Sequence, residues 1–125
     1  LNTPERFPAC RLELRDPVER MRELALSERD WVLVMTHDHQ LDQNVLELAL
    51  QKEPRYIGLV GSRRKVLTLR ERIAARSGAP FPNDRVYGPV GLDLGAVGPE
   101  ELAVSIVAEL IALRHGKKAA HLRAT

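Results

Sequence analysis

The sequence predicts an α/β fold in which helices flank a mainly parallel sheet. Short β-prone apolar runs are each followed by a longer segment with apolar residues at helical spacing, and this pairing occurs four times. Strands that alternate with helices form βαβ units, whose strands run parallel. The 125 residues suffice for one hydrophobic core but not for two. We therefore expect residues 1–125 to form a single, partial domain, with 117–125 as a frayed tail.

The first strand–helix passage is the weakest of the four. Residues 11–14 form a poor strand candidate. Asp16 then caps a helix with Pro17 at its first position and Glu19 in its first turn, where these residue types are favoured.

The second passage contains the strongest strand candidate. Residues 31–35 (Trp-Val-Leu-Val-Met) show no polar alternation, so we expect this strand to be covered on both faces. A helix follows residues 36–39 and runs to about Glu53, because Pro54 cannot continue it.

In the third and fourth passages a short strand again precedes a helix. Residues 56–60 (Tyr-Ile-Gly-Leu-Val) form a buried strand, and the helix after them ends near Gly78. Residues 85–87 form a brief edge strand, and residues 89–98 form a glycine-rich loop that is too long for a plain connector. Pro99 then begins the last predicted helix, which Gly116 ends.

Three cations, Arg63, Arg64 and Lys65, occupy the first turn of the third predicted helix. That end of a helix favours anions, so cations there are destabilising unless a negative group lies opposite. Together with the turn at Gly61 and the cap at Ser62, they indicate a pocket for a phosphate-like anion. The alternative is a solvated basic helix end. The glycine spacing fits neither a P-loop nor a dinucleotide-binding fingerprint.

Polar residues leave the preceding strand at the same edge of the sheet, where ligands bind in open α/β sheets. Thr36, His37 and Asp38 would line a ligand crevice there. In the alternative, Asp38 or Asp42 caps the next helix and the imidazoles are solvated. His37 and His39 could touch a metal, but no matching cluster completes a metal site.

Two further features of the last third of the chain are open to more than one interpretation. In the glycine-rich loop, Gly91 would let backbone amides approach a ligand, and Asp93 could accept a hydrogen bond from a base or sugar; a structural turn is the alternative. Glu109 lies on an apolar helix face, where its carboxylate needs a partner such as an arginine or has a functional role. Spacing alone assembles no nucleophile–base or acid–base pair, so we assign no catalytic residue.

Composition disfavours several classes of protein. The lone Cys10 excludes an internal disulfide framework and favours a reducing, cytoplasmic location. No apolar run approaches the length that spans a membrane. The arginines are concentrated in a few segments, which favours a local anion site over a nucleic-acid-binding surface. The chain begins with Leu1 rather than Met, which indicates a fragment.

Four segments carry a family resemblance: residues 34–39 (VMTHDH) with Asp42, 56–64 (YIGLVGSRR), 89–95 (PVGLDLG) and 99–109 (PEELAVSIVAE). In this order they resemble the C-terminal Rossmann-like domain of the xanthine dehydrogenase accessory family. Its members are also described as molybdenum-cofactor insertion proteins and as accessories of carbon monoxide dehydrogenase. The likeness covers residues 6–116.

The resemblance implies a cytoplasmic chaperone rather than an enzyme. Such a protein binds molybdenum cofactor, as molybdopterin or its dinucleotide form, and shields it while its sulfido ligand is installed with a cysteine desulfurase as partner. It then delivers the cofactor to a xanthine dehydrogenase-type molybdoenzyme, and it acts as a homo-oligomer such as a dimer. The cofactor's phosphate or dinucleotide tail suits an anion site. The implied cofactor-binding residues are Thr36, His37, Asp38, Gly61, Ser62, Arg63, Arg64, Gly91 and Asp93.

The chain departs from the family pattern at its start. The family's domain begins with a strand, a glycine-rich turn, a helix and a second strand, and we expect this chain to lack that unit as well as the small domain before it. In the usual strand order 3-2-1-4-5-6 the lacking strands are central, so the four remaining strands could not form one continuous sheet in their family positions. We expect the N-terminal half or a second subunit to complete the sheet, or the strands to pair differently.

Two other functions are weighed against the chaperone. An NAD(P)-binding oxidoreductase domain would use the same basic turn, but the chain has no G-x-G-x-x-G motif. A nucleic-acid or protein interaction module would use the helix over residues 63–76, whose cations occur on several faces without interleaved aromatics. We therefore expect neither a nucleic acid nor a membrane as a partner.

Overall fold

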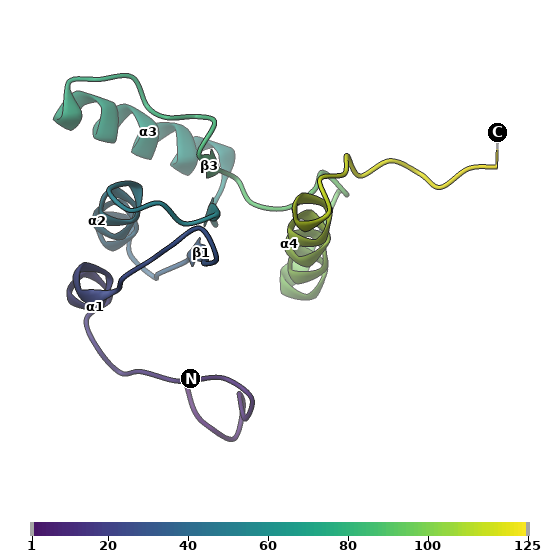
Figure 1. The fold of residues 1–125 in the computed structure, drawn as a ribbon, viewed down its shortest axis with the longest axis horizontal. Helices are drawn as coiled ribbons and strands as arrows, with labels where there is room; N and C mark the ends of the chain where they lie inside the picture. The colour runs from purple at the N-terminus through teal and green to yellow at the C-terminus, as the bar shows by residue number, and fades with distance from the viewer. Residues whose placement is uncertain (1, 125) are drawn as a thin grey trace.

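The computed structural model describes residues 2–124 and contains a three-stranded parallel sheet with helices on both sides (Figure 1). The strands are β1 (Trp31–Val34), β2 (Tyr56–Leu59) and β3 (Val86–Tyr87). They lie side by side in chain order, with β2 in the centre.

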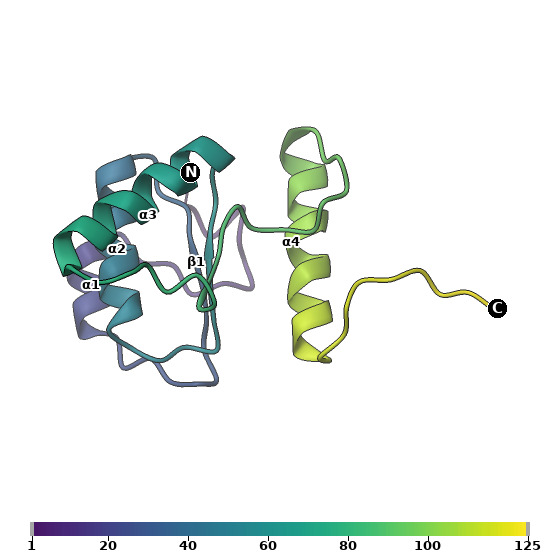
Figure 2. The ribbon, with the colours of Figure 1, turned by 90° about the horizontal axis from the view of Figure 1, so that it is seen from above.

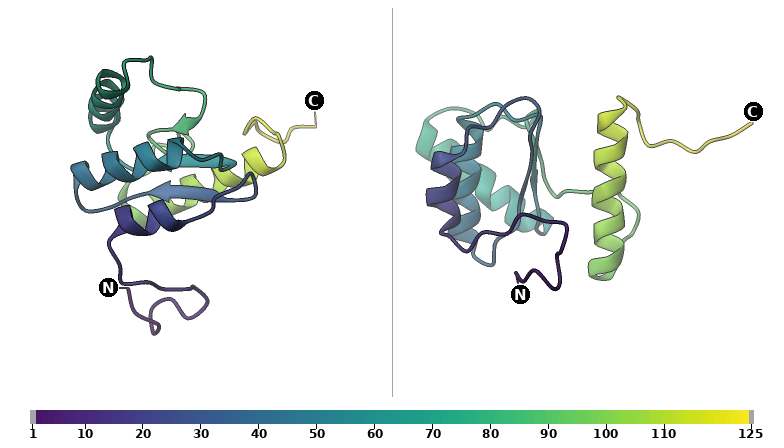
Figure 3. Two further views of the ribbon diagram at one scale, coloured as in Figure 1. Left: turned by 60° about the vertical axis from the view of Figure 1, so that its left-hand side comes forward. Right: turned by 60° about the horizontal axis from the view of Figure 1, so that its bottom comes forward.

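The helices divide unequally between the two faces of the sheet. On one face lie α1 (Pro17–Glu23), α2 (His39–Leu50) and α3 (Arg63–Ser77), and on the other lies α4 (Gly98–Arg114) (Figure 2). The right-hand view of Figure 3 shows the same division, with α4 joined to the rest of the fold through a loop. This arrangement confirms the predicted Rossmann-like α/β fold, in which helices flank a parallel sheet.

The hydrophobic core lies between the sheet and the helices α1, α2 and α3. Ile57 and Leu59 of β2 are both 1% exposed and point toward these helices. They pack with buried apolar residues of every element on that side: Met21, Val34, Val45, Leu46, Ala49, Val66, Leu69, Ile73 and Val86. Because side chains alternate along a strand, the neighbouring residues of β2 face α4 instead.

Several helix ends form where the sequence predicts them. The Asp16 carboxylate caps α1 by accepting a hydrogen bond from the Val18 N–H at 2.8 Å. The Ser62 hydroxyl caps α3 by accepting one from the Lys65 N–H at 3.1 Å. Gly78 ends α3 in the left-handed conformation, with φ at 69°. Helix α2 ends at Leu50, three residues before the predicted Glu53.

The predicted strand at residues 11–14 is wrong. Leu14 is 88% exposed, and Glu13 forms an ion pair with Arg20 of α1 at 2.9 Å. No strand lies beside this segment among residues 2–124, so its backbone groups have no ladder to join. The three observed strands form one continuous sheet, so the predicted interruption is also wrong. The sheet has two edge strands, β1 and β3, each of which pairs only with β2 among the described residues.

Strand β1 is covered on one face only among the described residues. Val34 is 2% exposed and faces the helices, whereas Leu33 is 38% exposed and the adjoining Met35 is 60% exposed. The expectation that both faces would be covered is therefore wrong for this part of the chain. On this face Trp31 packs against Tyr56, with ring centroids 5.4 Å apart, whereas Leu33 and Met35 keep much of their surface exposed among the described residues.

Three aromatic side chains lie across the sheet on the side that faces α4. The ring centroids of Trp31 and Tyr56 are 5.4 Å apart, and those of Tyr56 and Tyr87 are 5.0 Å apart. The Tyr56 ring passes over Gly58, where an added Cβ would lie 2.6 Å from the Tyr56 hydroxyl oxygen. Gly58 thus provides the space that the aromatic side chain occupies.

The C-terminal segment lies outside the helices and strands. Residues 117–124 form no helix or strand and run away from the sheet (Figure 1). Over residues 2–124, each helix is too short or too polar to cross a membrane.

Candidate functional site

A cavity of about 570 Å³ lies between α3 and the segment of residues 88–93. Its α3 side is lined by Arg63, Val66, Leu67 and Arg70. The two walls follow directly from β2 and β3, so the cavity opens at the carboxyl ends of these strands. In open α/β sheets ligands bind at this edge.

The α3 wall carries two guanidinium groups because of helical spacing. Arg63 and Arg70 are seven residues apart, which places them on one face of the helix. Arg70 donates a hydrogen bond from Nη2 to the Gly88 carbonyl at 3.2 Å, and its guanidinium lies 5.7 Å from the centre of the Phe81 ring. Its Nε is buried and finds no acceptor among the described residues. The wall therefore has hydrogen-bond donors to offer to an anion.

The opposite wall is held in place by backbone hydrogen bonds. The Val90 N–H donates to the Leu59 carbonyl of β2 at 3.2 Å, and the Leu92 N–H donates to the Ser105 carbonyl of α4, also at 3.2 Å. Gly91 has a φ of 101°, and an added Cβ there would lie 2.5 Å from the Ser105 hydroxyl oxygen. Only glycine fits at this position without strain.

Glu109 of α4 links this wall to the central strand. Its Oε1 accepts a hydrogen bond from the Tyr56 hydroxyl at 2.8 Å and from the Gly91 N–H at 3.2 Å. Burial, together with the bond to the Glu109 carboxylate, raises the pKa of Tyr56 well above its usual range. The prediction that Glu109 needs a partner is confirmed, but the suggested arginine is wrong. A phenol and a backbone amide fill that role.

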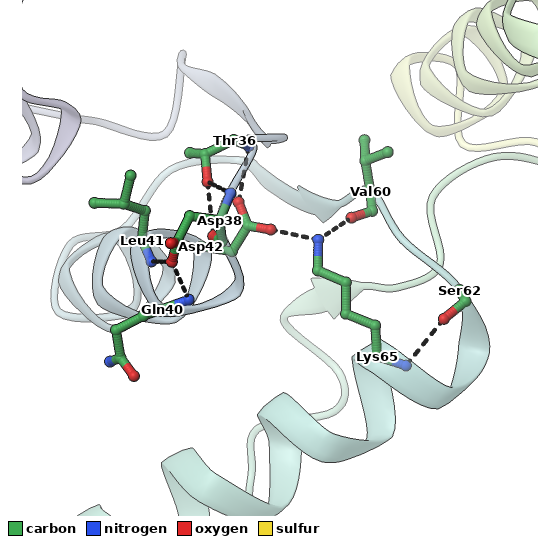
Figure 4. Close-up of polar contacts among 8 residues, drawn as sticks. All are labelled: Thr36, Asp38, Gln40, Leu41, Asp42, Val60, Ser62 and Lys65. Carbon is green, nitrogen blue, oxygen red and sulfur yellow. Dashed lines mark hydrogen bonds and ion pairs between the residues drawn. The ribbon is translucent and has the colours of Figure 1, made fainter.

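A second polar cluster lies at the ends of β1 and β2 (Figure 4). Asp38 caps α2 by accepting hydrogen bonds from the Gln40 N–H at 2.7 Å and from the Leu41 N–H at 3.1 Å. The hydrogen bonds from Leu41 and Gln40 hold the pKa of Asp38 below its usual value. The Thr36 hydroxyl donates to the Asp38 carbonyl at 2.9 Å. Of the two predicted interpretations of Asp38, the structure shows the helix cap.

Asp42 and Lys65 form a buried ion pair in the same cluster (Figure 4). The Lys65 Nζ donates to Asp42 Oδ2 and to the Val60 carbonyl, the latter at 2.9 Å. Asp42 Oδ1 accepts the Thr36 N–H at 2.8 Å. Lys65 therefore joins two loops at the edge of the sheet. The prediction that its charge belongs to the anion pocket is wrong. Asp42 does not cap α2, which was the alternative considered for it.

The structure divides the predicted site residues into two groups. Arg63, Gly91 and Asp93 line the cavity, together with Arg70, which the prediction missed. The remaining predicted residues lie outside the cavity lining: Thr36, His37, Asp38, Gly61, Ser62 and Arg64. Arg70 could have been found from the sequence, because it shares a helix face with Arg63. Over residues 2–124, no group of three or more His, Cys, Asp or Glu side chains could hold a metal ion.

Comparisons with known proteins add an independent line of evidence. A family model described as the XdhC Rossmann domain matches residues 1–110. A probable xanthine dehydrogenase subunit of Bacillus subtilis is 36% identical over 113 residues, which cover 90% of this chain and 32% of that protein. An uncharacterized protein of Escherichia coli, YqeB, is 29% identical over 86 residues, or 69% of this chain and 16% of that protein.

A solved structure is similar as well. The crystal structure of a xanthine dehydrogenase from Bacillus halodurans matches with a TM-score of 0.78 and 39% identity, over 92% of this chain and 34% of that one. The chain thus spans about a third, or less, of the length of these relatives.

Proposed function

The chain belongs to the XdhC Rossmann-domain family, and we propose that it takes part in the maturation of a xanthine dehydrogenase-type molybdoenzyme. In this role it binds molybdenum cofactor, as molybdopterin or its dinucleotide form. It shields the cofactor while a cysteine desulfurase supplies the sulfido ligand, and it then passes the cofactor to the enzyme. The protein acts as a chaperone and not as a catalyst.

The observation that carries this proposal is the cavity with two arginines at the carboxyl edge of the sheet. Its volume of about 570 Å³ lies within the range of small-molecule sites. Arg63 and Arg70 are suited to phosphate oxygens, because a guanidinium presents several donors in a planar arrangement. The buried Nε of Arg70 is a donor for which a bound phosphate would provide an acceptor. These residues fit a cofactor that carries a phosphate.

The other lining residues would bind and orient the rest of the cofactor. Gly91 lets the loop backbone approach the ligand closely, and Asp93 would accept a hydrogen bond from an amino group of the pterin or of a nucleotide base. Val66 and Leu67 would exclude water from the apolar side of the ligand. The cofactor itself supplies the molybdenum centre on which the receiving enzyme depends.

A further polypeptide would complete the fold in this proposal. Strand β1 has one edge without a partner strand among the described residues, and such an edge readily accepts another strand. On the α4 side, Val104, Val107 and Ile111 are more than half exposed. We infer that another segment of a longer protein, or a second subunit, packs on these surfaces.

A retention assay tests the proposed function. The protein is incubated with molybdenum cofactor, with NAD(P) or with duplex DNA, and the ligand retained after gel filtration is measured. We expect retention of molybdenum cofactor alone, and its loss in Arg63→Ala. Arg64→Ala is the matched control, because Arg64 is exposed and lies outside the cavity lining.

Three outcomes would contradict the proposal. The first is equal loss of retention in Arg63→Ala and Arg64→Ala, which would place the cofactor outside the cavity. The second is retention of NAD(P) with hydride transfer, which would favour an oxidoreductase. The third is retention of DNA in place of the cofactor.

A further inference from the structure

We propose that the cavity between α3 and residues 88–93 selects a ligand with a diphosphate group linked to a nucleoside, and that Arg70 determines this selectivity. This inference rests on the proposed function, because it specifies the form of the cofactor that the same site holds. It assigns the dinucleotide form, in which the pterin is joined to a nucleotide through two phosphates, in preference to the form with a single phosphate.

The two cations of the cavity are separated along α3. Arg63 and Arg70 lie on one face of α3, about 10 Å apart along the helix axis at 1.5 Å per residue. Arg70 is fixed at its end of the cavity by the Gly88 carbonyl and the Phe81 ring. Arg63 is exposed and lies in the first turn of the helix. A diphosphate carries two phosphate groups and so offers separate acceptor oxygens to Arg63 and to Arg70, whereas a single phosphate would have to draw both side chains to one point.

The Arg70 guanidinium has a donor available for a bound anion. A guanidinium has five N–H donors in one plane. In Arg70, Nη2 donates to the Gly88 carbonyl, and the buried Nε has no acceptor among residues 2–124. A buried donor without an acceptor is destabilising. An anion bound at this end of the cavity would supply acceptors, so the unpaired Nε indicates that a phosphate belongs beside Arg70 and not only beside Arg63.

The side of the cavity opposite α3 carries a negative charge. Asp93 is an acidic residue in the lining and would repel a phosphate placed next to it. It would instead accept hydrogen bonds from a neutral donor, such as the amino group of a nucleotide base. The volume of about 570 Å³ exceeds what a phosphate needs and leaves space for a nucleoside. The charges therefore place phosphates along α3 and the base toward Asp93.

Calorimetric titration of the protein with nucleotides tests this inference. The probes are CDP, GDP and ADP, the corresponding monophosphates, and inorganic pyrophosphate. Because a hydrogen bond to a charged group contributes about 1.5–3 kcal/mol, we expect at least one diphosphate to bind about tenfold or more tightly than its monophosphate. In Arg70→Lys, which keeps the charge but loses the planar donor arrangement, this ratio should fall to about one.

A second variant separates binding from folding. Arg72→Ala removes a cation from the same helix, but Arg72 is exposed and lies outside the cavity lining, so the preference for the diphosphate should remain. Thermal unfolding followed by circular dichroism establishes that both variants are folded. The inference is overturned if parent protein binds monophosphate and diphosphate equally, if Arg70→Lys keeps the preference, or if no nucleotide binds.

The results also distinguish this inference from the proposed function. Retention of molybdenum cofactor without any diphosphate preference would overturn the inference and leave the proposed function standing. Binding of nucleoside diphosphates through Arg70, without retention of molybdenum cofactor, would support the inference and overturn the proposed function.

Discussion

At the scale of single residues, the contact between Lys65 and Asp42 shows how an ion pair organises the edge of the sheet. Asp42 has no exposed side-chain surface and Lys65 has 12%, so both charges are largely removed from water. Lys65 also donates to the Val60 carbonyl at the end of β2, and Asp42 accepts the Thr36 N–H after β1. These bonds fix the two loops that precede α2 and α3.

Removal of one partner of this pair should be strongly destabilising. Lys65→Met leaves the Asp42 carboxylate buried without its counter-charge, so we expect the free energy of unfolding to fall by about 3–5 kcal/mol. Urea unfolding at pH 7 measures it. In the double variant Lys65→Met/Asp42→Asn, the amide oxygen can still accept the Thr36 N–H, and part of the loss should be recovered. A double variant less stable than Lys65→Met would contradict the prediction.

At the scale of elements, α4 is joined to the sheet through Tyr56 of β2. The Tyr56 hydroxyl donates to Glu109, and Glu109 also accepts the Gly91 N–H. A second link is the Arg55 guanidinium, which donates to the Arg114 carbonyl at 3.2 Å near the end of α4. The position of α4 and that of the cavity loop therefore depend on the same carboxylate.

Because of the Tyr56 hydroxyl, the free energy of unfolding should depend on pH in the alkaline range. The pKa of Tyr56 is raised in the folded protein above its ordinary value of 10.0, because the side chain is buried and bonded to Glu109. The unfolded chain therefore loses this proton first. The contribution of the Tyr56 hydroxyl to the free energy of unfolding is therefore complete below about pH 10, and it declines as the pH rises above that value.

Substitution of Tyr56 by Phe tests this link. We expect Tyr56→Phe to lower the free energy of unfolding by about 1–3 kcal/mol at pH 8, because Glu109 loses a hydrogen-bond donor. The alkaline decline between pH 9 and 11 should become shallower than in the parent protein. Tyr87→Phe is the control, since Tyr87 stacks on Tyr56 without a bond to Glu109. An unchanged alkaline decline in Tyr56→Phe would show that other groups cause it.

At the scale of the whole molecule, α4 presents an exposed apolar surface. Val104, Val107 and Ile111 are 63%, 52% and 54% exposed, and with Ala103 and Ala108 they line a shallow groove. Contiguous exposed apolar surface of this kind marks an interaction site. We expect it to be covered by a second polypeptide.

The association of the chain should therefore depend on this surface. In analytical ultracentrifugation we expect parent protein to form dimers or larger species at high concentration, and Val107→Glu/Ile111→Glu to remain monomeric. Burying two charges in an apolar contact is unfavourable, which is why the substitution should prevent association. Leu14→Glu, at an exposed leucine outside α4, should associate like parent protein. A parent protein that is monomeric at all concentrations would contradict the prediction.

Local signals in the sequence were sufficient to predict most helices and strands and the residues at which they end. The side chains of Asp16 and Ser62 cap helices by bonding to backbone groups only a few residues away, and Gly78 ends a helix through its own backbone conformation. These roles therefore follow from the sequence alone. The fully buried run Tyr56–Leu59 was likewise evident from its composition. Residues 11–14 failed as a strand because a strand needs a neighbour, which no local pattern provides.

Long-range contacts, by contrast, were decided by the tertiary structure. The sequence shows three cations in the first turn of α3, but only packing reveals that Lys65 points toward Asp42 while Arg63 lines the cavity with Arg70. The pairing of Tyr56 with Glu109 joins residues 53 positions apart in the chain. Helical and strand periodicities report which face a residue occupies, whereas the identity of its partner depends on how the elements pack in three dimensions.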